Sequence, residues 1–105
     1  MRKFSDVERY EVELIDESGK KRTFKARARC FTLLDELDEM KKKYKDVKDE
    51  RKLMESDYEA IAILFGVPSS ELKSFSHDLI IQVSNDYTEY RTKKLLPQEK
   101  KGQAN

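Results

Sequence analysis

The chain has 105 residues, of which 41% are charged, and its 22 Lys and Arg residues almost balance 21 Asp and Glu residues, for a net charge of +1. A hydrophobic share of 37% leaves enough apolar side chains for one modest core, so we expect a single domain over residues 1–95. No apolar run approaches the ~20 residues of a membrane span. Residues 1–10 lack the apolar stretch of a secretory signal, and a single cysteine, Cys30, excludes an internal disulfide. We therefore expect a cytoplasmic protein without membrane contact.

Two alternating runs at residues 10–29 predict a β-hairpin, because a half-buried strand places every second side chain on the same face. The runs are separated by a polar turn that contains Gly19, where a positive φ is readily adopted. The predicted apolar face comprises Tyr10, Val12, Leu14, Phe24 and Ala26. The other face opposes Glu11 and Glu13 to a row of Lys and Arg, which favours cross-strand attraction.

The apolar spacing then changes to that of helices, and it predicts three of them at about residues 32–46, 53–65 and 76–94. Thr32 is placed to cap the first helix and Ser76 the last, while Ser56 offers an alternative start for the second. Gly66 followed by Pro68 ends the second helix, and a short turn leads on through Leu72. The expected fold is α+β, a hairpin followed by a mainly helical bundle, with a polar flexible tail at 96–105.

Residues with catalytic or metal-binding chemistry are few. His77 is the only histidine and lies just after the predicted cap Ser76, where an exposed position is expected. Cys30 ends the second strand and is expected to pack as a small hydrophobe. The three glycines are too far apart to form a phosphate-binding loop. We therefore expect no enzymatic activity, no cofactor and no metal.

Charge is distributed unevenly along the chain. The net charge is +3 over residues 1–30, −3 over 31–60, −3 over 61–90 and +4 over 91–105. The basic row of the hairpin, from Lys20 to Arg29, is the best candidate for nucleic-acid contact. Glu11 and Glu13 neutralise part of that face, however, so the sequence favours self-association or a protein partner and no nucleic acid.

The last predicted helix is apolar over a wide arc. Its stripe comprises Leu79, Ile80, Val83, Tyr87 and Tyr90, and Ile81 lies off that stripe. Such a helix is either buried on two sides or partly exposed as a protein-binding face, because large aliphatic and aromatic side chains favour interfaces.

The order of features resembles a known family. The features are a hairpin, a first helix, the segment from Asp57 to Val67 with its Phe65-Gly66 ending, a loop from Pro68 to Leu72 and a final helix. In these features the chain resembles the tail assembly chaperones of long-tailed bacteriophages and prophages. The resemblance covers residues 8–93. It implies a non-enzymatic protein of the host bacterial cytoplasm that self-associates, keeps the tape measure protein soluble and helps to recruit tail tube protein.

Two hypotheses on the binding surface follow. In the chaperone hypothesis, tape measure helices or neighbouring copies contact a surface that we expect to include Phe65, Phe75, Ile81, Tyr87 and Tyr90. In the alternative, the chain is a monomeric adaptor or regulatory module that binds one partner by strand addition at the hairpin edge.

Overall fold

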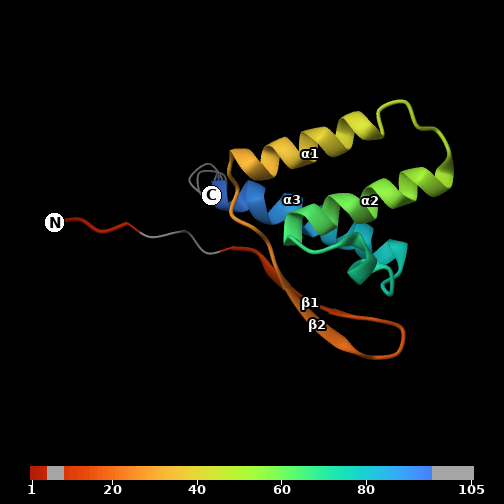
Figure 1. Ribbon diagram of the computed structural model, residues 1–105. Helices are drawn as coiled ribbons and strands as arrows, with labels where there is room; N and C mark the ends of the chain where they lie inside the picture. Colours follow the sequence, from red (N-terminus) through yellow and green to blue (C-terminus); the bar gives the residue numbers. More distant parts are fainter. Residues whose placement is uncertain (5–8, 96–105) are drawn as a thin grey trace, which may run out of the picture.

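The computed structural model describes residues 1–4 and 9–95, so the tail expected at 96–105 lies outside the described residues. Strands β1 (Glu11–Ile15) and β2 (Lys21–Lys25) form an antiparallel hairpin. Helices α1 (Phe31–Lys43) and α2 (Glu50–Phe65), the short 3-10 helix η1 (Ser69–Leu72) and helix α3 (His77–Leu95) follow. The helices lie on one side of the hairpin, which confirms the predicted α+β class (Figure 1).

The hairpin has the predicted faces. Its register pairs Val12 with Phe24 and Leu14 with Arg22. The carboxylate of Asp16 accepts hydrogen bonds from the amides of Ser18 and Lys20, and Gly19 has a φ of 88° in the turn. Four of the five expected apolar positions are buried and Val12 is partly buried, so the alternation correctly predicted the face toward the helices.

The bounds of α1 and α2 differ from the prediction. The first helix begins at Phe31 with Cys30 as its cap, and no side chain provides a capping hydrogen bond, so the assignment of Thr32 as the cap was wrong. It ends at Lys43. The second helix begins at Glu50, earlier than either predicted start, because the Asp49 carboxylate accepts a hydrogen bond from the Lys52 amide.

The connection from α2 to α3 agrees with the prediction. Gly66 ends α2 in the left-handed conformation, with φ 70°, and the amides of Gly66 and Val67 bond back to carbonyls of the last turn. Pro68 cannot continue the helix and is followed by η1. The Ser76 hydroxyl accepts a hydrogen bond from the Leu79 amide and caps α3.

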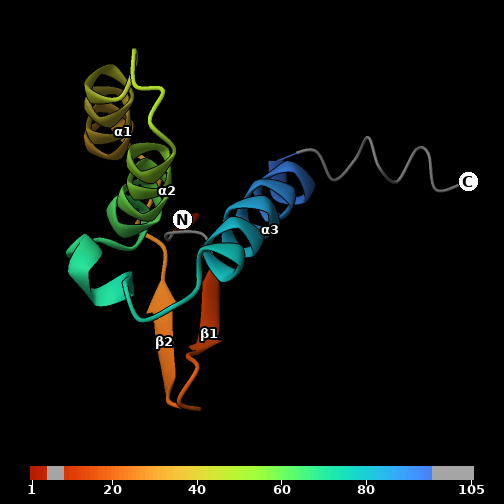
Figure 2. The same ribbon diagram turned by 90° about the vertical axis from the view of Figure 1, so that its right-hand side faces the viewer.

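One core joins the hairpin to the helices. Its largest fully buried side chains are Leu33 of α1, Leu72 of η1, Ile80 of α3, and Phe75, which lies between η1 and α3. In Figure 2, α1 and α2 lie toward the β2 side of the hairpin, and α3 runs past the β1 side and away from α1. The hairpin is therefore covered on one face, and its outer face and two long edges are left at the surface.

Candidate protein-binding surface

Two of the predicted binding residues lie in the core. Phe65 and Phe75 are 7% and 1% exposed. The ring of Phe24 stacks on Phe65 with centroids 5.2 Å apart and meets Phe75 edge-on at 6.0 Å. Placing them on an exposed surface was wrong, because both rings are needed to fill the space between the hairpin and the helices.

Tyr87 and Tyr90 are half-buried and face the hairpin. The Tyr10 ring lies 5.3 Å from Tyr87 and 5.2 Å from Tyr90 between centroids. At about 100° per residue, Ile81 lies on a different side of α3 from these tyrosines, and it is also half-buried. The structure therefore brings Tyr87 and Tyr90 together around Tyr10, but it does not bring the five predicted residues into one surface.

A hydrogen bond adds to this aromatic cluster. The Tyr10 hydroxyl donates to the Asp86 carboxylate across 2.7 Å. Burial of the phenol and, to a smaller extent, this bond raise the pKa of Tyr10 well above its ordinary value of 10.0. The hydroxyl attaches the start of the hairpin to the middle of α3.

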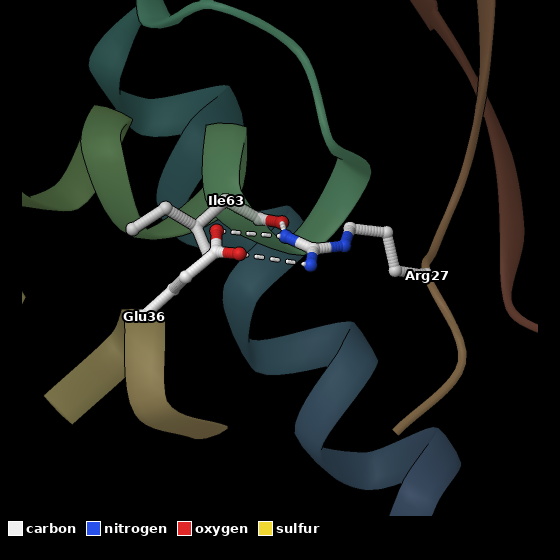
Figure 3. Close-up of polar contacts among 3 residues, drawn as sticks. All are labelled: Arg27, Glu36 and Ile63. Carbon is white, nitrogen blue, oxygen red and sulfur yellow. Dashed lines mark hydrogen bonds and ion pairs between the residues drawn. The ribbon is translucent and has the colours of Figure 1, made fainter. Parts of the chain in front are cut away.

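Arg27 attaches the end of the hairpin to α1 and α2 (Figure 3). Its guanidinium donates to both oxygens of Glu36, at 3.0 and 3.1 Å, and to the Ile63 carbonyl at 3.0 Å. Its amide donates to the Leu64 carbonyl at 2.9 Å. The side-chain hydrogen bonds between Arg27 and Glu36 hold the pKa of Glu36 below its ordinary value and raise that of Arg27. In the sequence, Arg27 is one member of the basic row, and its role as an attachment could not be predicted there because it depends on tertiary contacts.

Arg22 makes a similar attachment from β2 to η1. It donates to the Glu71 carboxylate at 2.7 Å and to the Glu71 carbonyl at 3.1 Å, while its guanidinium lies 4.8 Å from the centre of the Phe24 ring. Two members of the basic row are thus engaged within the fold. The row is correspondingly less available to phosphate groups than its sequence suggested.

Neither Cys30 nor His77 has the exposure that the sequence predicts. Cys30 is exposed, so its expected packing in the interior was wrong. His77 is half-buried, and its Nε2 lies 2.8 Å from the Asp57 carboxylate, which attaches α3 to α2. Within residues 1–4 and 9–95, no group of three or more His, Cys, Asp or Glu is arranged to hold a metal ion. None of the helices in this part of the chain is long and apolar enough to cross a bilayer.

A shallow groove lies between α1 and α2. Its lining residues are Asp35, Glu36, Glu39, Met40, Lys43, Glu59 and Ile63. Three of its four carboxylates already have partners. Glu36 binds Arg27, Glu39 lies 3.8 Å from the Lys42 ammonium, and Glu59 accepts from Lys43 at 3.3 Å and from the Tyr44 hydroxyl at 2.9 Å. The polar side chains of the groove therefore stabilise the contact between the two helices and offer little unpaired charge to a ligand.

The long edges of the hairpin are different. The Ala26 amide bonds to the Tyr10 carbonyl, and the Asp16 amide bonds to the Lys20 carbonyl. Because inward and outward pairs alternate in an antiparallel ladder, the backbone groups of every second residue point away from the partner strand. These outward residues are Glu11, Glu13 and Ile15 on β1, and Lys21, Thr23 and Lys25 on β2.

The outward backbone groups are available to another chain. Across the described segments, no hydrogen bond engages the outward amides or carbonyls of these six residues. An exposed row of unpaired amides and carbonyls can accept an additional β-strand.

Comparison of the chain with models of known protein families, with functionally characterised proteins and with solved structures gives no significant match.

Proposed function

We propose that this chain is a non-enzymatic protein-binding module that holds an extended segment of its partner at an open edge of the β-hairpin. The observation that carries the proposal is the row of unpaired backbone groups on each edge of a two-stranded sheet. Strand addition uses such groups for affinity and uses the flanking side chains for specificity.

The attachment of the hairpin to the helices supports this function. Tyr10 contacts α3, Arg22 contacts η1, and Arg27 contacts α1 and α2. An isolated two-stranded hairpin is marginally stable in water. These contacts hold both strands extended before a partner arrives, so less conformational entropy is lost on binding.

The partner is proposed from the resemblance to the tail assembly chaperones. We extend the proposal to tail assembly in the cytoplasm of a bacterial host, with the tape measure protein as the held partner and tail tube protein as the one recruited. The segment from Ile61 to Val67 supports this extension, since it forms the end of a helix with Gly66 as its left-handed cap, followed by a short turn and a final helix.

Proline substitutions test the role of the edges. Glu13→Pro and Thr23→Pro each remove one outward amide that takes no part in the hairpin ladder, so the fold should tolerate them. We expect the double variant to lose most of the soluble tape measure protein recovered on co-expression, measured by sedimentation of the cell extract. The matched control, Glu13→Ala with Thr23→Ala, removes the same two side chains but keeps both amides, so it should retain much more solubilisation than the double proline variant.

The outcomes separate the two parts of the proposal. A double proline variant that keeps its circular dichroism spectrum and still solubilises the tape measure protein would overturn binding at the edges. Failure of the unmodified chain to solubilise that protein would overturn the tail-assembly assignment. In that case, edge binding would still be tested by the peptide measurements described below.

A further inference from the structure

We infer that the β1 edge is the binding edge and that its ligand is an extended segment in which Lys or Arg alternates with apolar residues. This inference rests on the proposed function and adds to it the edge and the chemistry of the segment. Three features of the structure carry it: the charges beside each edge, the position of η1 and the path of α3.

The two edges carry opposite charges. On the outer face of the hairpin, β1 presents the exposed side chains of Glu11 and Glu13, and β2 presents those of Lys21 and Lys25. A strand added to β1 would place every second side chain opposite the two glutamates, where a cation is attracted and an anion is repelled. Pairing of two copies through the same edge would bring like charges together, which disfavours a symmetric dimer through β1 or through β2.

The neighbouring elements obstruct β2 more than β1. Arg22 links β2 to η1 through two hydrogen bonds, and the chain leaving β2 is bonded to α2 through the Arg27 amide. These contacts place η1 and the end of α2 on the β2 side of the hairpin, as Figure 2 shows. An added strand would therefore be obstructed by fewer neighbouring elements along β1 than along β2.

Helix α3 passes close to the start of β1. It runs past the β1 side of the hairpin in Figure 2, and its half-buried Tyr87 contacts Tyr10. Val12, on the inner face of β1, is only partly buried in the core. An added strand would thus have its inward side chains beside the partly buried Val12, where apolar residues fit, and its outward side chains beside Glu11 and Glu13.

Synthetic peptides and amide hydrogen exchange test the inference. A short peptide alternating Lys and Val should bind the full chain about tenfold more tightly than one alternating Glu and Val, because two cross-strand charge pairs change sign. On addition of the Lys peptide, the amides of Glu11, Glu13 and Ile15 should become protected from exchange. Those of Lys21, Thr23 and Lys25 should be unchanged.

Paired variants provide the controls. Glu11→Gln with Glu13→Gln should abolish most of the preference for the Lys peptide, while Lys21→Gln with Lys25→Gln should leave it intact. Protection at β2 alone would overturn the edge assignment but leave the proposed function standing. Lack of binding by the Lys peptide, or equal binding of both peptides, would overturn the ligand chemistry. Binding of the Lys peptide without protection at either edge would overturn both proposals.

Discussion

Arg27 shows how one side chain determines where the hairpin lies. Its guanidinium has three hydrogen bonds to two different helices, and its own amide adds a fourth contact to α2. Only a planar, forked cation can bind both carboxylate oxygens of Glu36 in parallel while also reaching a carbonyl. The end of β2 is therefore fixed relative to α1 and α2.

This contact predicts an acid-sensitive component of stability. Folding lowers the pKa of Glu36 below its ordinary value of 4.5, so its contribution is present above that pH and is lost as the pH falls through the folded-state pKa. We expect the melting temperature of the unmodified chain to fall more steeply below pH 4.5 than that of Glu36→Gln. Thermal unfolding across this range measures the difference, and parallel curves would contradict the expectation. Asp16, whose pKa is also lowered, titrates in both proteins and cancels.

At the level of elements, the hairpin and the helices depend on one another through the aromatic core. Phe24 contributes one ring from β2, and Phe65 and Phe75 contribute the rings on the helical side. The carbonyl of Phe75 also accepts a hydrogen bond from the buried Tyr58 hydroxyl. The segment between η1 and α3 is thereby held against α2.

Removal of the Phe75 ring should therefore affect the whole fold. We expect Phe75→Ala to lower the free energy of unfolding by about 3–5 kcal/mol, the usual cost of deleting a fully buried phenyl ring. Chemical denaturation measures this loss. Ile81→Ala is the control, since this side chain of α3 is only half-buried, and it should lower the free energy of unfolding by much less. Similar losses in the two variants would contradict the assignment of Phe75 to the core.

Local patterns predicted the elements better than the surfaces between them. Alternation identified the inner face of the hairpin because burial on a sheet has a period of two residues, and Gly66 with Pro68 marked the end of α2. The start of α2 was missed because Asp49 lies in a charged stretch with few apolar residues. The burial of Phe65 and Phe75 and the contacts of Arg27 depend on which elements meet in space, which one sequence does not specify. The outward residues of each edge follow from the register and from the hydrogen bonds at the two ends of the ladder, which side-chain alternation alone does not give.

At the scale of the whole molecule, charge is segregated along the chain. The net charges of +3 at residues 1–30 and +4 at 91–105 flank a middle of −3 and −3. We propose that such an arrangement attracts copies of the chain to one another, the basic part of one approaching the acidic part of the next. The tail-assembly proposal includes this self-association, whereas a simple adaptor would remain a monomer.

Sedimentation velocity over a range of protein concentrations distinguishes these states. We expect the weight-average sedimentation coefficient to rise with concentration at low salt and to rise less at high salt, because added ions screen surface charges. Glu11→Gln with Glu13→Gln raises the net charge of residues 1–30 from +3 to +5, so this variant should associate at least as strongly as the unmodified chain. A sedimentation coefficient independent of both concentration and salt would favour the adaptor.

The bond between Tyr10 and Asp86 has a consequence for synthesis of the chain. Its partners are separated by 76 positions in the sequence, and the ring contacts of Tyr10 with Tyr87 and Tyr90 span a similar distance. Contacts of such long sequence separation close late in folding. While the ribosome has not yet added Tyr90, the first strand lacks its aromatic neighbours and the hairpin has only marginal stability of its own. The nascent chain therefore acquires its rigid edge only when most of α3 has been synthesised.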